Sequence, residues 1–138
     1  MTASDFARQF EYENGFYLTS TVQRFNKLTA HLDLFRMSSQ AQGAIVECGV
    51  FKGASLSRWV KFRALLETPG SRRIIGFDTF GTYPESTHAL DDEKRREFIE
   101  EAGNQSIARN DLLSTLERLG HYENIELIEG DIIKTIPP

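Results

Sequence analysis

The spacing of hydrophobic and polar positions divides the chain into helices and strands. Apolar residues recur at intervals of three and four from Val22 to Phe35, which predicts an amphipathic helix over residues 20–36, begun by a capping box of Ser20 and Gln23. This apolar stripe needs a partner surface. The partner is either the protein core or, in a more specialised interpretation, a cofactor that the helix covers as a lid, or a second copy of the chain.

A strand, a helix and a second strand follow this first helix. Residues 44–50 form a continuous apolar run, which is typical of a central strand in a parallel sheet. The next helix has one apolar face and ends at residues 68–71, and residues 73–78 form the second strand. The pattern predicts a βαβ unit with the usual right-handed crossover.

The remaining residues predict two more helices and a third strand. Segment 79–90 is rich in Gly, Pro, Thr and Ser and is long for a connection, so it is a candidate functional loop. We expect Asp91 to cap a short helix that ends at Gly103, and a second helix to cover residues 110–120. Residues 125–128 form the third strand. The fold class is therefore α/β, with crossover helices around a parallel sheet.

Length and composition indicate one mildly acidic globular domain. The chain has 138 residues, 40% hydrophobic residues and a net charge of -4. Residues 1–18 show no clear period and are interpreted as a flexible leader or an arm that packs on another part, whereas residues 19–138 form the domain. The basic residues at 72–73 and 94–96 lie beside carboxylates and are interpreted as solvated faces, so nucleic acid is not expected as a partner.

Targeting signals and membrane segments are absent from the sequence pattern. Residues 1–15 have neither the basic nor the apolar region of a signal peptide, and no apolar run approaches the ~18 residues that span a bilayer. We expect a cytoplasmic protein without a membrane partner. The single cysteine, Cys48, lies in a strand and is expected to be a buried, inert thiol.

The turn after the first strand carries the clearest chemical signal. Glu47, Gly49 and Gly53 are spaced as in a strand-to-helix turn that holds a nucleoside-bearing cofactor. Gly49 lets the backbone approach a ligand, and Gly53 lets the next helix begin close to the strand. Glu47 stands where the dinucleotide fingerprint has its first glycine, so a cofactor with hydroxyls, an amine or a positive charge suits the turn better than a pyrophosphate.

Each predicted strand ends in an acidic residue. The three acids are Glu47, Asp78 and Asp131, and parallel strands bring their carboxyl ends to one edge of the sheet, where ligands bind. Asp78 is suited to accept two hydrogen bonds from a ribose diol, and Asp131 to accept one from an exocyclic amine. Any one of them alone is better explained as a helix cap or a loop acid, whereas three at one edge favour a cofactor site.

Four successive segments resemble motifs of class I S-adenosylmethionine-dependent methyltransferases. They are ECGVFKG, GFDTF, PESTHALDD and NIELIEGDIIKTIP, and the resemblance extends over residues 16–138. Within that superfamily the chain is most similar to the macrocin O-methyltransferase type, which methylates sugar hydroxyls. The expected cofactor is therefore S-adenosyl-L-methionine, and the expected acceptor is a small molecule, a deoxysugar or a related compound. Phe51 replaces the middle glycine that is common elsewhere in the superfamily.

The resemblance also assigns roles to individual residues. It implies that the cofactor is bound by Glu47, Gly49, Gly53, Ser55, Asp78, Thr79 and Asp131. Tyr17 and Ser20 would reach the cofactor's carboxylate if the first helix closes as a lid. His88 matches the loop histidine that acts as general base for the acceptor hydroxyl, and the alternative is an exposed loop histidine. His31 and His121 are assigned surface roles, and Lys52 is expected to face solvent.

The family has more strands than this chain supplies. We expect the three strands here in the spatial order 3-2-1, which leaves the first strand as an unpaired edge. The divalent metal of the family, Mg, would be held by acids that follow the fourth strand, and these are absent from the sequence. The chain is therefore interpreted as the N-terminal part of a larger methyltransferase, truncated before the metal-binding and acceptor half and inactive alone.

Two other functions stay open at this point. The chain could be a non-catalytic cofactor-binding or assembly module that forms a homo-oligomer through helix 20–36 or the open first strand. It could also be an NAD-dependent oxidoreductase, against which Glu47 in place of the first glycine argues.

Overall fold

Three parallel strands form a single sheet. The computed structural model of the chain describes residues 3–83 and 89–136. The strands are β1 (Ile45–Cys48), β2 (Ile74–Asp78) and β3 (Ile125–Glu129), and they pair in the order β1-β2-β3. Ile74, at the start of β2, is in register with Ile45 on one side and Ile125 on the other. The expected α/β fold and the expected strand order are confirmed.

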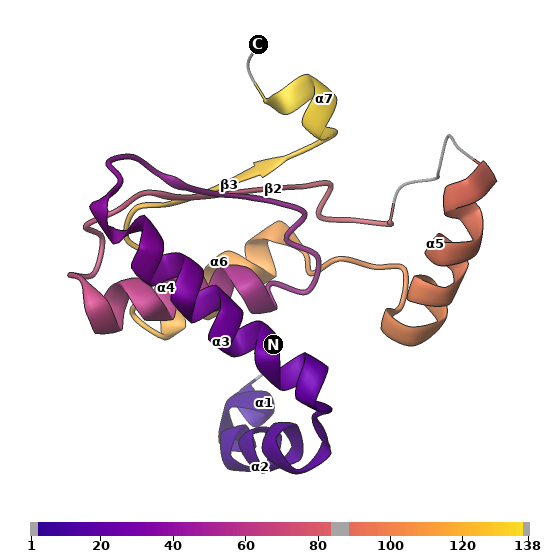
Figure 1. Ribbon diagram of the computed structural model, residues 1–138, viewed down its shortest axis with the longest axis horizontal. Helices are drawn as coiled ribbons and strands as arrows, with labels where there is room; N and C mark the ends of the chain where they lie inside the picture. Colours follow the sequence, from indigo (N-terminus) through magenta and orange to yellow (C-terminus); the bar gives the residue numbers. More distant parts are fainter. Residues whose placement is uncertain (1–2, 84–88, 137–138) are drawn as a thin grey trace.

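Most of the helices lie on one side of this sheet. In Figure 1, α3, α4 and α6 lie below the strands, α7 lies above them, and α5 stands apart beyond the carboxyl end of β2. The bounds of the helices are α1 Ala3–Ala7, α2 Gln9–Thr19, α3 Val22–Met37, α4 Ala54–Leu66, α5 Ala89–Ala102, α6 Arg109–Arg118 and α7 Ile132–Thr135, and a 3-10 turn at Ser38–Gln40 follows α3. No helix in these described residues has the length and apolar character needed to cross a membrane.

The core lies between the sheet and the helices α4 and α6. Leu56 of α4 and Ile74 of β2 are completely buried, and Gly76 lets the helix approach the sheet closely. A Cβ at Gly76 would lie 2.6 Å from Leu56 Cδ1 and 2.8 Å from Val50 Cγ2. The buried core cluster consists of Val50, Leu56, Val60, Ile74, Phe80, Leu112, Leu116 and Leu127.

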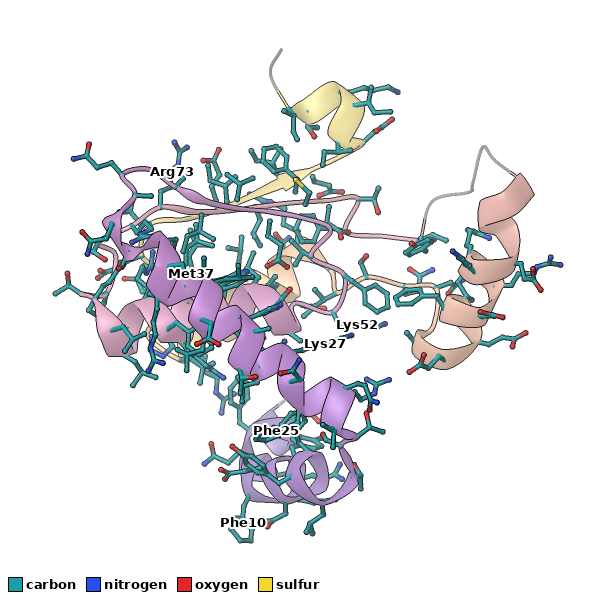
Figure 2. The ribbon with its side chains drawn as sticks, viewed as in Figure 1. Phe10, Phe25, Lys27, Met37, Lys52 and Arg73 are labelled. Carbon is teal, nitrogen blue, oxygen red and sulfur yellow. The ribbon has the colours of Figure 1, made fainter. Side chains whose placement is uncertain are left out.

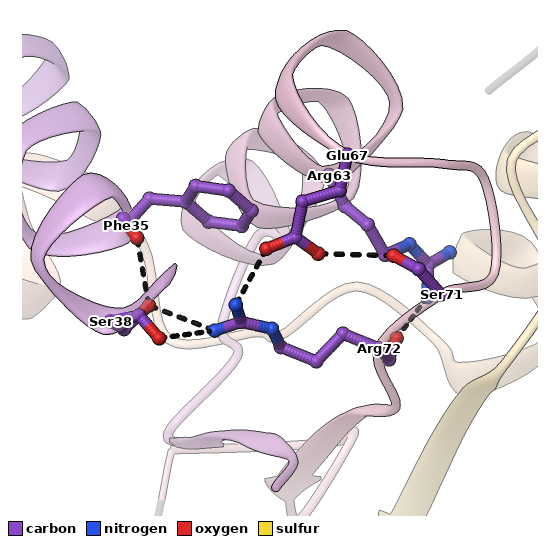
Figure 3. A network of polar contacts seen from close by, with 6 residues as sticks. All are labelled: Phe35, Ser38, Arg63, Glu67, Ser71 and Arg72. Atoms are coloured by element: carbon purple, nitrogen blue, oxygen red, sulfur yellow. Dashed lines mark hydrogen bonds and ion pairs between the residues drawn. The ribbon is translucent and has the colours of Figure 1, made fainter. Parts of the chain in front are cut away.

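Two arginines join the amino-terminal edge of the sheet to the helices. Arg63 is 1% exposed, and its guanidinium donates to the carbonyl oxygens of Arg72 at 2.5 Å and Glu123 at 2.6 Å. Arg72 in turn pairs with Glu67 at 2.5 Å and donates to Ser38 Oγ at 2.9 Å, as Figure 3 shows. The interpretation of residues 72–73 as a solvated face is therefore wrong for Arg72, because its carboxylate partner and the core helix enclose it.

The N-terminal residues are helical, although their sequence lacks a period. They form α1 and α2, and Phe16 and Tyr17 of α2 contact Phe25 of α3 with ring centroids 6.3 and 6.0 Å apart. These ring contacts place the end of α2 against the first turns of α3. Phe10 remains 74% exposed and points away from the rest of the molecule in Figure 2.

The first long helix packs on the core through its second half. Phe35 is 2% exposed and its ring lies 5.9 Å from that of Phe62 on α4, whereas Val22 is 82% exposed. The core-packing interpretation of the stripe thus applies to the C-terminal half of the helix. The predicted capping box is shifted by one residue, because the side chain of Thr21, and not that of Ser20, accepts from the backbone N–H of Arg24 at 3.3 Å.

Two further local expectations are wrong. Helix α5 begins at Ala89, so Asp91 lies inside it and does not cap it. Cys48 is exposed and not buried, because β1 is at the edge of the sheet and its residues alternate between covered and open sides. Val46, on the same open side, is 53% exposed.

Candidate functional site

The turn after β1 is built from backbone in the left-handed region. Gly49, Phe51 and Gly53 have φ values of 91°, 49° and 80°. The N–H of Gly49 donates to the carbonyl of Phe77 at 2.8 Å, which continues the sheet pairing into the turn, and that of Gly53 closes the turn on the carbonyl of Val50 at 2.9 Å. The alternation of conformations turns the chain from the strand into α4 within a few residues.

The two glycines of this turn serve different purposes. A Cβ at Gly49 would meet no atom within 4 Å, so the side of the turn that it faces is open space that a ligand could fill. A Cβ at Gly53 would lie 3.0 Å from Leu112 Cδ1, and Gly53 therefore lets the start of α4 lie against α6. The close neighbour is a helix, where the sequence led us to expect the strand.

Asp78, at the end of β2, holds three segments together. One carboxylate oxygen accepts from the N–H of Phe51 at 2.9 Å, and the other accepts from the N–H of Phe80 at 2.7 Å and from Ser106 Oγ at 2.9 Å. A carboxylate offers about four acceptor positions, so roughly one is left for a ligand. Asp78 thus fixes the turn, and its capacity to bind both hydroxyls of a ribose is reduced.

Phe51 adopts the conformation that glycine adopts most readily. Its φ of 49° costs an L-residue roughly 1–2 kcal/mol. The hydrogen bond to Asp78 offsets part of this cost, and the carbonyl of Phe51 also accepts from the N–H of Ile107 at 2.7 Å. These two hydrogen bonds explain how a phenylalanine can occupy a position at which the family that the sequence resembles often has glycine.

The ring of Phe51 connects the turn to α5. It lies 5.2 Å from the ring of Phe98 on α5, and Phe98 in turn lies 5.4 Å from Tyr83. Lys52 is exposed, as expected, and its ammonium group donates to the carbonyl of Gln105. These contacts hold α5 beside the carboxyl end of the sheet.

Glu47 points toward α4. Its two carboxylate oxygens accept from Ser55 Oγ at 2.5 Å and from the indole Nε1 of Trp59 at 2.7 Å. Partial burial raises the pKa of Glu47, and these two hydrogen bonds, together with the charge of Arg58, act in the opposite direction. The structure thus brings Glu47 and Ser55 together, and Trp59 joins them.

Trp59 also contacts His31 of α3. The imidazole stacks on the indole with ring centroids 4.6 Å apart, and its Nδ1 is buried without a hydrogen-bond partner. Burial and the charges of Arg58 and Lys27 lower the pKa of His31, so the neutral form is favoured. The surface role expected for His31 holds only in part, because packing of α3 on α4 half-buries the ring.

The other candidate residues lie outside the turn of residues 47–53. Asp131 caps the short helix α7 by accepting from the N–H of Ile133 at 3.0 Å, which is the cap alternative considered for these acids. Thr79 follows Asp78 and is half-buried. Tyr17 is exposed on α2, and Ser20 lines a pocket at the start of α3. His88 lies outside the described residues.

Sequence reasoning missed Trp59 and Ser106 as parts of this site. Ser55 and Trp59 are four residues apart on one helix, so once Ser55 was considered, the same face of the helix indicated Trp59. Ser106 had no such signal, because it lies in an irregular segment 28 residues from Asp78. Within the described part of the chain, no group of three or more His, Cys, Asp and Glu residues is placed to hold a metal ion.

The solved structures similar to this one include methyltransferases. The calicheamicin methyltransferase CalS11 matches with a TM-score of 0.67 and 25% identity over 91% of this chain and 51% of that one. The apo structure of CalS11, a TDP-rhamnose 3'-O-methyltransferase, matches with a TM-score of 0.56 and 23% identity over 92% of this chain and 49% of that one. The O-methyltransferase NovP matches with a TM-score of 0.59 and 15% identity over 80% of this chain and 47% of that one.

This chain has a methyltransferase fold. It spans about half the length of the CalS11 and NovP chains. No protein-family model matches the sequence, and no curated protein is significantly similar to it.

Proposed function

We propose that the chain forms the cofactor-binding part of an S-adenosylmethionine-dependent O-methyltransferase that methylates a hydroxyl of a deoxysugar or a related small molecule. The observation that carries the proposal is the turn of residues 47–53, in which a half-buried carboxylate adjoins an open cradle. It is supported by the likeness to CalS11, whose described acceptor is TDP-rhamnose. The proposal extends this acceptor class, a sugar carried on a nucleotide, to the present chain.

Each candidate residue has a role in this proposal. Glu47, oriented by Ser55 and Trp59, would accept from the cofactor's ammonium group. Gly49 leaves room for the cofactor, and Asp78 keeps the turn in shape and retains about one acceptor position for a ribose hydroxyl. We propose further contacts with the cofactor for Gly53, Thr79, Asp131, Tyr17 and Ser20.

Methyl transfer requires alignment and removal of a proton. Bound S-adenosylmethionine supplies an electrophilic methyl group on a sulfonium. With the cofactor bound, the acceptor oxygen would replace the sulfur at that methyl carbon, and the hydroxyl proton would pass to a base, for which we propose His88. The half-buried environment of Glu47 limits water near the cofactor's amino-acid end. The described residues do not offer a fitting site for the metal of the family, so no step is assigned to it.

Calorimetry with S-adenosylhomocysteine tests the proposal. We expect Gly49→Ala to weaken binding at least ~10-fold, because the new methyl group enters the cradle and, by a general estimate, each 1.4 kcal/mol is tenfold in affinity. Gly120→Ala is the matched control, since Gly120 has a φ of 71° and open space at its Cβ but lies in the loop before β3, at the opposite edge of the sheet.

Two results would contradict the proposal. One is an absence of S-adenosylhomocysteine binding to the unmodified protein. The other is an equal loss of affinity in both glycine variants, which would show that backbone strain and not the cradle matters. Titration with NAD in parallel checks the oxidoreductase alternative, for which binding of NAD alone would be the supporting result.

A further inference from the structure

A pocket rich in positive charge lies where the start of α3 meets α4. Its cavity measures about 320 Å³, and we call it the basic pocket; it is lined by Phe16, Thr19, Ser20, Arg24, Lys27 and Arg58. The lining has three cationic side chains, two hydroxyl groups and no carboxylate. Such a set can neutralise and hydrogen-bond an oxyanion.

The positive charges of the basic pocket are only partly compensated. Arg24 pairs with Glu101 of α5 at the exposed surface. Among the described residues, neither Lys27 nor Arg58 forms an ion pair. Like charges gathered in one pocket repel each other, and an anion between them removes that repulsion. The electrostatic potential of the basic pocket therefore favours binding of an anionic ligand.

Two further observations show positive potential at this place. The charges of Arg58 and Lys27 both act, after burial, to lower the pKa of His31, which packs beside them on Trp59. The first turn of α3, capped by Thr21, adds the positive end of a helix dipole, equivalent to roughly half an elementary charge.

The basic pocket is linked through Arg58 to the turn that we assign to the cofactor. Arg58 precedes Trp59, whose indole donates to Glu47, and the charge of Arg58 contributes to lowering the pKa of Glu47 against the effect of burial. An acceptor hydroxyl has to reach the methyl group at the amino-acid end of the cofactor. Arg58 acts electrostatically on Glu47, so the basic pocket is near enough to attract a charged group attached to that acceptor.

We propose that the three cationic side chains of the basic pocket, Arg24, Lys27 and Arg58, bind the diphosphate of a nucleotide-linked sugar and so hold the acceptor for methylation. This inference rests on the proposed function. Two arginines and a lysine from two helices exceed what one carboxylate needs and suit the several negative charges of a diphosphate, to which arginine binds in a bidentate manner. The cavity is at the lower end of the roughly 300–1,000 Å³ found for ligand pockets, which fits a diphosphate with part of its sugar.

The single tryptophan of the chain gives a direct measurement. Trp59 stacks on His31 and follows Arg58 in the sequence, so its fluorescence reports on the basic pocket. We expect thymidine diphosphate and inorganic pyrophosphate to change this fluorescence saturably, with affinity that falls as salt rises. Free rhamnose, which lacks the phosphates, is expected to have no effect at the same concentrations.

Charge-removing variants locate the binding. Lys27→Gln and Arg58→Gln are each expected to weaken thymidine diphosphate binding at least ~10-fold, the effect of losing one charge-assisted hydrogen bond. Arg36→Gln is the matched control on the same helix, because Arg36 is exposed, outside the pocket and 4.0 Å from Asp33. It should change the affinity less than about twofold by the same estimate.

The same variants separate this inference from the proposed function. Calorimetry with S-adenosylhomocysteine should give nearly unchanged affinity in Lys27→Gln. If that variant instead loses S-adenosylhomocysteine and keeps thymidine diphosphate, the pocket holds the cofactor's carboxylate and the inference is wrong. Normal S-adenosylhomocysteine binding without any response to thymidine diphosphate or pyrophosphate would overturn the inference alone.

Discussion

Replacing Asp78 with asparagine tests whether its carboxylate holds the site together. The amide keeps one oxygen, which can still accept from Phe80 N–H and Ser106 Oγ. Its NH₂ group then occupies the position of the oxygen that accepts from Phe51 N–H, so two donors face each other. The turn loses the hydrogen bond that offsets the left-handed conformation of Phe51.

The size of the effect follows from this one contact. A hydrogen bond to a charged group contributes about 1.5–3 kcal/mol, and an N–H left without a partner costs a further ~1 kcal/mol or more when it is desolvated. Since the site is half-buried, we expect a loss of about 2 to 3 kcal/mol in the free energy of unfolding. With ~2.1 cal/mol/K of unfolding entropy per residue over 138 residues, this corresponds to a fall in Tm of about 7 to 10 °C.

Thermal unfolding by circular dichroism measures this change. Ser106→Ala removes one donor and leaves the carboxylate, so we expect a smaller loss of about 1 kcal/mol. Ser114→Ala, at an exposed position on α6, is the control and should not lower Tm. A Tm for Asp78→Asn within about 1 °C of the unmodified protein would refute the reasoning, because that is far below the shift expected for such a contact.

Two further predictions concern the core and the pH dependence. Gly76→Ala should destabilise the protein by about 1 to 3 kcal/mol in urea unfolding, because its Cβ would lie 2.6 Å from Leu56 Cδ1; a change below about 0.5 kcal/mol would show that the helix can move away. Glu47→Gln should raise the urea midpoint at pH 7, because burial raises the pKa of Glu47 and ionisation is therefore unfavourable in the folded state. The amide can accept from Trp59 and donate to Ser55 Oγ. This advantage should shrink below about pH 4, where both states bind the proton, and an advantage independent of pH would contradict the assignment.

Much of the fold could be predicted because it depends on local pattern. The apolar runs at residues 44–50, 73–78 and 125–128 predicted the three strands. Helices were predicted between them, and strands joined by crossover helices pair in parallel. Positive-φ glycines such as Gly103 and Gly120 marked the helix ends. The pattern predicted no element where it is weak. Residues 1–18 have no period, yet the aromatic contacts of Phe16 and Tyr17 with Phe25 place this region on α3.

The sequence by itself determined which residues stand at the carboxyl ends of the strands, because each acid lies at or just after the end of an apolar run in the chain. What these acids contact was decided by the tertiary structure. The donors to Asp78 come from Phe51 and Ser106, 27 and 28 residues away, and only packing of the loops brings them to one carboxylate. Similarly, Lys27 and Arg58 lie on separate helices, and they share one pocket because the apolar faces of α3 and α4 pack together.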